Sequence, residues 1–115
     1  PGSHANSEPE NQALTKFLTE EKPAFILSLH SWKPLLNVNG ECMKEAEAIH
    51  ALTGYPIEPH IGYPTPGCLG TYAGLERGMP TLTYEIERGL ALHKVLEVHV
   101  PAVCAALEEV ARRVG

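Results

Sequence analysis

The sequence predicts an α/β fold with three layers, in which helices cover both faces of a mostly parallel or mixed sheet. Segments with apolar residues at helical spacing alternate along the chain with short segments that are apolar throughout or at every second position. That alternation is typical of layered α/β domains. A chain of 115 residues with 43% apolar residues can bury one core, so residues 1–115 are expected to form a single domain.

The first predicted helix begins at Ser7, because Ser7-Glu8-Pro9-Glu10 has the pattern of a capping box. The helix is expected to end before Pro23. Its apolar face consists of Ala13, Leu14, Phe17 and Leu18. Residues 1–6 show no periodicity and are interpreted either as a loop of the protein or as a tag scar left by cloning.

A strand is predicted at residues 24–29, which are nearly all apolar and are followed by His30. A strand of this composition is usually buried on both faces of a parallel sheet. The segment 31–40 is expected to be an irregular loop, since it holds a proline and two asparagines. A second helix is predicted at residues 41–53, and Gly54 is well placed to end it.

Three prolines favour extended backbone after the second helix, with a short strand near Ile57. A short helix then ends at Gly78, and the strand that follows begins near Pro80. In that strand apolar residues occupy every second position up to Ile86, the pattern of a half-buried strand. Glu85 belongs to the other face, near the carboxyl end, where ligands bind in open α/β sheets.

The last segment, residues 90–114, is predicted to be a long amphipathic helix. Pro101 lies inside it and should kink or split it, because proline lacks the N–H group that the helix needs. The residues at helical spacing are Leu92, Val95, Leu96, His99, Val103, Leu107 and Val110.

The composition argues against several classes of function. The net charge of −5 is spread along the chain, which argues against nucleic acid and membrane surfaces as partners. No apolar run approaches the roughly 18 residues of a membrane-spanning helix, and no secretory signal is visible, so a cytoplasmic location is favoured. The three cysteines are too scattered for a disulfide framework or a thiolate zinc site. All 14 acidic residues are glutamates, so any carboxylate chemistry must use glutamate.

Two predicted strand ends carry side chains suited to catalysis, His30 and Glu85. If both strands are parallel, these ends open on the same side of the sheet, and such a pair suits a metal ion with a general base. The alternatives are a structural histidine and a solvated carboxylate at the sheet edge. Tyr63 precedes Pro64 in a loop, where its phenol either reaches outward as a hydrogen-bond donor or packs in the turn.

Other motifs are weaker indications of chemistry. Glu47 and His50 match the Glu-x-x-His of di-iron bundles, but no second copy is found, and a solvated helix face is the simpler interpretation. His93 and Glu97 are most simply a surface pair. Cys68 stands at a helix start without an evident basic partner, so it is interpreted as packing, and a hydrolase that uses Cys68 is a third, weaker hypothesis.

Three stretches are distinctive in their order and spacing. They are Phe25-Ile-Leu-Ser-Leu-His30-Ser, Tyr63-Pro-Thr-Pro-Gly-Cys-Leu-Gly-Thr-Tyr-Ala-Gly and Pro80-Thr-Leu-Thr-Tyr-Glu85. Together they resemble the carboxypeptidase A-like zinc metallopeptidases. The helix start Ser7-Glu-Pro-Glu-Asn-Gln-Ala-Leu resembles the bacterial branch that includes the murein tripeptide amidases. The likeness runs over nearly the whole chain.

The resemblance implies a role for each of four residues. His30 matches the last zinc ligand of the family, and Glu85 matches its general base. Tyr63 matches a mobile tyrosine that steadies the substrate, and Leu69 falls near the residue that lines the specificity pocket. An apolar residue there would not select a charged terminal side chain. The implied activity is hydrolysis of peptide or murein-peptide bonds with one zinc ion as cofactor.

The sequence departs from the family in its metal ligands. The family takes two further zinc ligands from an upstream His-x-x-Glu, and its substrate-holding arginines also lie upstream, but none of the six histidines here begins that motif. The chain therefore resembles the carboxyl-terminal half of a catalytic domain. We expect it to be inactive alone and to form a homo-oligomer or pair with the missing half. The alternative is a non-catalytic α/β binding or scaffold module that has lost the metal site.

Overall fold

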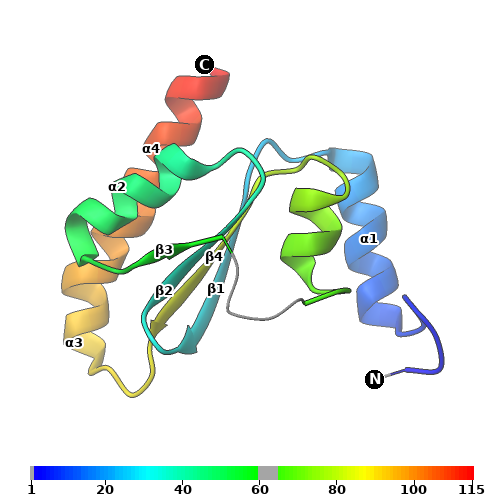
Figure 1. The fold of residues 1–115 in the computed structure, drawn as a ribbon, viewed down its shortest axis with the longest axis horizontal. Coiled ribbons are helices and arrows are strands. Elements are labelled where there is room, and N and C mark those ends of the chain that lie inside the picture. The colour runs from blue at the N-terminus through cyan, green and yellow to red at the C-terminus, as the bar shows by residue number, and fades with distance from the viewer. Residues whose placement is uncertain (1, 60–64) are drawn as a thin grey trace.

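The computed structural model describes residues 2–59 and 65–115. Its strands are β1 (Ile26–Trp32), β2 (Leu35–Asn39), β3 (Ile57–Glu58) and β4 (Thr81–Glu87). Its helices are α1 (Pro9–Glu21), α2 (Met43–Thr53), α3 (Leu92–Lys94) and α4 (Val100–Val114), with two π-helical segments, η1 (Gly70–Leu75) and η2 (Val95–His99). Figure 1 shows how these elements are arranged.

Within the described residues, the strands form one mixed sheet in the order β1-β4-β2-β3. β1 runs parallel to β4, whereas β2 runs antiparallel to β4 and parallel to β3. Helices flank this sheet, so the predicted α/β class with a mixed sheet is confirmed.

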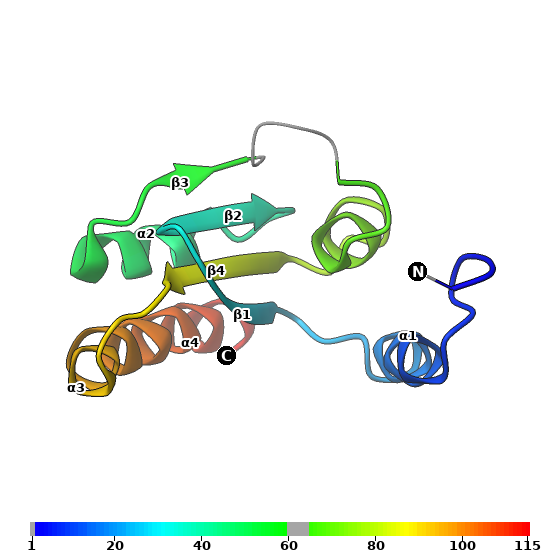
Figure 2. The ribbon, with the colours of Figure 1, turned by 90° about the horizontal axis from the view of Figure 1, so that it is seen from below.

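Helices lie on both sides of the sheet. α2 and α4 pack against each other on one face, while η1 lies on the other face with α1 beyond it (Figure 1 and Figure 2). The main core lies between the sheet and the α2–α4 pair. Its buried members are Leu36, Cys42, Ala46, Ile49, Leu82, Tyr84, Ala102 and Ala106. The other helical layer is thinner, because α1 buries only Leu18 among its residues.

The segment 31–40, predicted to be an irregular loop, contains the strand β2 instead. β2 pairs with both β4 and β3, and Leu35 and Leu36 are buried in it. The two asparagines of β2 contact neighbouring elements. The Asn37 side-chain amide donates to the backbone oxygen of Glu58 at 3.2 Å, and Asn39 is buried against the glycines of η1. Asn37 is therefore hydrogen-bonded to β3, whereas the buried Oδ1 of Asn39 packs close to η1 without a hydrogen bond in the described residues.

The prediction that the strand before His30 is buried on both faces is wrong. Among the described residues β1 pairs with β4 alone, so it forms an edge of the sheet. The side chains from Leu29 to Trp32 are exposed, and Leu29 is 55% exposed. Proteins normally cover or blunt an apolar edge strand of this kind, because its backbone groups are ready to pair with another strand.

The start of α1 differs from the expectation. α1 has Glu8 as its N-cap residue, and the Ser7 hydroxyl donates to the Glu8 carboxylate rather than to the helix backbone, so the capping-box prediction is wrong. The predicted stop before Pro23 is confirmed. Pro101 lies just after the π-helical segment η2, which divides residues 92–114 into α3, η2 and α4, in agreement with the prediction that the long helix is split near Pro101. No helix in residues 2–59 or 65–115 is both long and apolar enough to cross a membrane.

Candidate functional site

His30 and Glu85 lie side by side near the carboxyl ends of β1 and β4. They are Cα partners in the parallel register of these strands. Paired residues project from the same face of a sheet, and neighbouring strands are about 4.8 Å apart. Since Tyr84 belongs to the core on the α2–α4 side, Glu85 points to the η1 face. The structure thus brings an imidazole and a carboxylate together at one rim, while the roles assigned to them stay predictions.

The carboxylate of Glu85 lacks a partner for one of its oxygens. Oε2 is buried and makes no hydrogen bond within the described part of the chain. Leu35, which pairs with Glu85 from β2, is buried beside it on the same face. A buried carboxylate oxygen without a partner costs free energy, so native proteins normally supply it with a proton, a cation or a donor. The described residues therefore leave this oxygen in need of a partner that they do not supply.

The imidazole of His30 is exposed and is held by one neighbour on its own strand. Its Nε2 lies 3.0 Å from the Ser28 hydroxyl. Its Nδ1 makes no hydrogen bond to a residue that the structure describes. Within the described residues, one ring nitrogen is therefore engaged by the protein, and the other has no hydrogen-bond partner.

A second row of polar side chains lies next to His30 and Glu85, two residues closer to the amino ends of β1 and β4. Ser28, Thr83 and Asn37 are paired in register across β1, β4 and β2, and all three face η1. The opposite face carries the apolar core. The η1 face of the sheet therefore offers hydrogen-bonding groups to a bound molecule, while the other face supplies most of the buried apolar surface.

The two remaining sequence-predicted residues are not seen beside His30 and Glu85. Tyr63 lies outside the described residues. Leu69 lines a cavity of about 280 Å³ between α1 and the η1 segment, together with Tyr72 and residues of α1. Neither His30 nor Glu85 lines that cavity. The role of Leu69 in substrate selection therefore stays a prediction.

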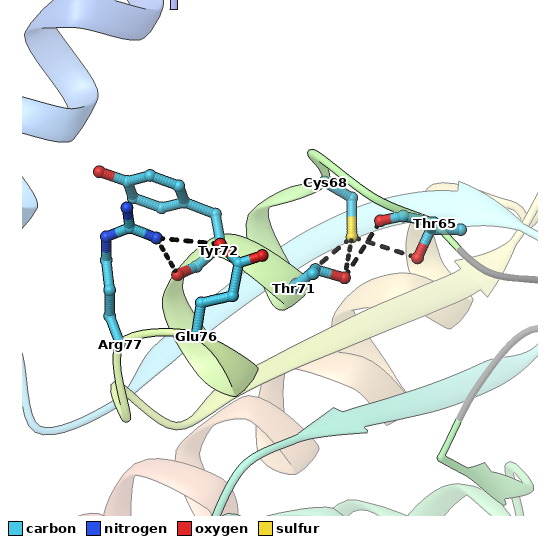
Figure 3. A network of polar contacts seen from close by, with 6 residues as sticks. All are labelled: Thr65, Cys68, Thr71, Tyr72, Glu76 and Arg77. Carbon is cyan, nitrogen blue, oxygen red and sulfur yellow. Dashed lines mark hydrogen bonds and ion pairs between the residues drawn. The ribbon is translucent and has the colours of Figure 1, made fainter. Parts of the chain in front are cut away.

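Cys68 lies in a network of hydroxyl groups at the start of η1, drawn in Figure 3. Its sulfur is 3.3 Å from the hydroxyl oxygens of Thr65 and Thr71. Burial raises the pKa of the Cys68 thiol, but hydrogen bonds with Thr65 and Thr71 outweigh burial and leave this pKa lowered. Close by, the Arg77 guanidinium stacks over the Tyr72 ring. The observed partners of Cys68 are two hydroxyls and the Thr71 backbone amide, and no general base is among them in the described residues.

The sequence places His99 on an apolar helical stripe but does not reveal its partners. His99 is 3% exposed; its Nδ1 is hydrogen-bonded with the Tyr84 hydroxyl, and its Nε2 lies 3.2 Å from the Tyr55 hydroxyl. Burial lowers the pKa of His99, and Glu87 offsets this only in part. Burial, and then the nearby Tyr55, raises the pKa of Tyr84. Because this cluster lies on the core face, it supports the fold rather than the site of Glu85.

The described residues do not fit a complete zinc site. Catalytic zinc ions use about three protein ligands. No group of three or more histidine, cysteine or acidic side chains comes together in the part of the chain that the structure describes. On the η1 face His30 supplies one imidazole and Glu85 one carboxylate, which are fewer ligands than a catalytic zinc site needs.

Comparison with known proteins adds a structural relationship. No protein-family model and no curated protein matches the chain. Among solved structures, the chain is similar to the murein-tripeptide amidase MpaA from Escherichia coli O157, with a TM-score of 0.71 and 23% sequence identity. The match covers 91% of this chain and 44% of the amidase chain, so this chain spans less than half the length of that protein. The α/β arrangement described above is therefore also the fold of one part of the amidase.

Proposed function

We propose that this chain is part of the catalytic domain of a zinc-dependent peptidase or amidase, to which it contributes His30 as a metal ligand and Glu85 as the general base. The observation that carries the proposal is the register of β1 and β4. It pairs an imidazole with a carboxylate whose Oε2 is buried without a partner among the described residues. The fold shared with the amidase supports the same class of reaction, the hydrolysis of an amide bond.

Glu85 is suited to accept a proton from an attacking water molecule. Its Oε2 has no partner in the described residues, and Leu35 covers the sheet on the side of β2. The same carboxyl group can return the proton to the leaving amine. In this proposal Tyr63 contacts the substrate, and Leu69 favours an uncharged terminal side chain. A murein peptide is the proposed substrate class, on the likeness to the amidase.

The proposal requires a second polypeptide segment. His30 cannot hold zinc tightly alone, because about three protein ligands are needed. The β2 side of Glu85 is closed by buried Leu35, whereas β1 has a free edge among the described residues. The missing ligands would therefore reach His30 from the β1 side. We propose that the chain alone is inactive and that a carboxypeptidase-like domain is completed at this edge.

Zinc affinity, measured by calorimetry with and without the polypeptide encoded directly upstream, tests the proposal. The isolated chain should bind zinc more weakly than micromolar, because one imidazole cannot replace a full ligand set. The two polypeptides together should bind one zinc ion tightly. The variant His30→Asn should abolish that tight binding, since it removes the one ligand that this chain contributes.

The matched control is His93→Asn, an exposed histidine on α3 whose replacement should leave zinc binding unchanged. Micromolar or tighter binding by the monomeric chain alone would contradict the claim that its site is incomplete. An upstream segment without His-x-x-Glu, or tight binding that survives His30→Asn, would contradict the proposed function and favour a scaffold module.

A further inference from the structure

Ser28 lies two residues before His30 on the same face of β1. Its hydroxyl oxygen is 3.0 Å from Nε2 of His30, and Ser28 itself is fixed in the strand by its register with Thr83. The imidazole of His30 is otherwise exposed. In the described part of the chain, this contact is the hydrogen bond that can set the direction of the ring.

A histidine that uses one ring nitrogen for a ligand commonly donates a hydrogen bond from the other. That second bond fixes the tautomer and the orientation of the ring. On β1 the engaged atom is Nε2, and Nδ1 is the atom without a hydrogen-bond partner among the residues that the structure describes. This arrangement is the one expected if Nδ1 is the nitrogen with which His30 binds its ligand.

We propose that Ser28 is the positioning residue of His30. The Nε2–H group donates to the Ser28 hydroxyl oxygen, and this bond holds the tautomer in which Nδ1 presents its lone pair. The inference rests on the proposed function for what Nδ1 binds, but not for the hydrogen bond itself. It gives Ser28 a role that a threonine can fill and an alanine cannot.

The same contact would also be found if Ser28 were a nucleophile activated by His30. A nucleophile and base of that kind need a third group that orients the base through its other nitrogen. Within the described residues Nδ1 has no such partner, and Glu85, the neighbour in register, has its buried Oε2 unbonded. The geometry therefore favours positioning over nucleophilic attack.

Nitrogen-15 NMR of the histidine rings tests the inference on the isolated chain, without zinc or a partner. Spectra are recorded at about pH 9, where histidine side chains are neutral, and His30 is assigned from the spectrum of His30→Asn. In the unaltered chain the Nε2–H tautomer of His30 should dominate. In Ser28→Ala the ratio of Nε2–H to Nδ1–H should fall about fivefold, the equivalent of one ordinary hydrogen bond.

Ser28→Thr should restore the ratio of the unaltered chain. Ser31→Ala is the matched control, because Ser31 adjoins His30 on β1 but projects from the opposite face. Its ratio should not change, and the backbone amide spectrum of each variant reports whether β1 is intact. An unchanged ratio in Ser28→Ala, or covalent labelling of Ser28 by a fluorophosphonate probe, would overturn the positioning role. Neither result would bear on zinc binding by the assembled domain, so the two proposals can fail separately.

Discussion

Glu45 and Glu85, two acids with a buried carboxylate oxygen, differ in what surrounds them. Glu45 is 1% exposed, and its Oε1 receives hydrogen bonds from Arg113 at 3.1 Å from Nε and 2.5 Å from Nη2. Glu85 has no such cation in the described residues, and its Oε2 is unbonded. A buried carboxylate held by an arginine joins two elements of a fold. A carboxylate left without a partner on a polar sheet face is the better candidate for chemistry.

Arg113→Ala should destabilise the chain, because it leaves the carboxylate of Glu45 buried without its cation. The expected loss is about 2–3 kcal/mol, reduced from the full cost of a buried pair because Arg113 is partly exposed. Arg112→Ala is the control, since Arg112 pairs with surface glutamates of its own helix and should cost under about 1 kcal/mol. Urea unfolding measures both, and equal losses would contradict the structural role of the Arg113–Glu45 pair.

The buried His99 should make stability depend on pH. Because its folded pKa is lowered below the usual 6.5, the unfolded chain takes up this proton first as the pH falls. The stability due to neutral His99 is therefore present above pH 6.5 and is lost as the pH falls from there toward the lowered value. Urea unfolding between about pH 8 and pH 5 should show a flatter profile for His99→Gln than for the unaltered chain.

The control is His93→Gln. Because His93 is exposed, the stability of this variant should depend on pH in the same way as that of the unaltered chain. A profile of His99→Gln that is as steep as that of the unaltered chain would show that another group is responsible.

At the scale of elements, the close packing of η1 against β2 depends on two glycines, Gly70 and Gly74. A Cβ atom at Gly74 would lie 2.5 Å from the backbone oxygen of Asn39, and one at Gly70 would lie 2.0 Å from its Oδ1. Real Cβ atoms are not found at such distances, so the π-helical segment approaches the strand as closely as it does because these side chains are absent. The close approach fixes η1 over the polar face that carries Glu85.

Gly74→Ala should lower stability by about 1–3 kcal/mol, since the backbone of Asn39 cannot move aside as a side chain could. The neighbouring Leu75 is 62% exposed, and Leu75→Ala should change stability by less than about 0.5 kcal/mol. Chemical denaturation compares the two variants. If Gly74→Ala lost no more stability than Leu75→Ala, η1 would not be packed against β2 as described.

The elements that could be predicted were those with a clear period or a clear stop. β4 alternates strictly, and α2 ends at Gly54, which has the left-handed φ of 72° that ends a helix. β2 was missed because asparagine is uncommon in strands, although Leu36 and Val38 alternate with Asn37 and Asn39. The contacts of the two asparagines with β3 and η1 are visible only in the structure. The edge position of β1 could not be inferred from an apolar run, because composition does not say how many neighbours a strand has.

At the scale of the whole molecule, the chain has an apolar edge strand and a helix that buries little. Leu29 on β1 and Phe17 on α1 are each 55% exposed, and Leu92 and Leu96 near the chain's last helix are more exposed still. Apolar side chains left in water in this number favour association with another polypeptide. Pairing with a complementary segment or with a second copy of the chain is therefore still the prediction for its partners.

The candidate site could be predicted in part. The sequence placed His30 and Glu85 at strand ends, but only the register shows that they are neighbours. It did not reveal the Ser28 contact or the buried Oε2 of Glu85, because both depend on side-chain packing. Leu69 was assigned through resemblance alone, and it lines a cavity that His30 and Glu85 do not line.

The most direct test of the central claim is the rate of amide hydrolysis by Glu85→Gln in the assembled domain, with a murein tripeptide as substrate. If Glu85 is the general base, kcat should fall about 10²–10⁴-fold while the protein stays folded. Glu87→Gln is the matched control, since Glu87 follows two residues later on the same strand and face but is exposed, and it should keep nearly full activity. Equal rates for the two variants would contradict the assignment of Glu85 as the catalytic carboxylate.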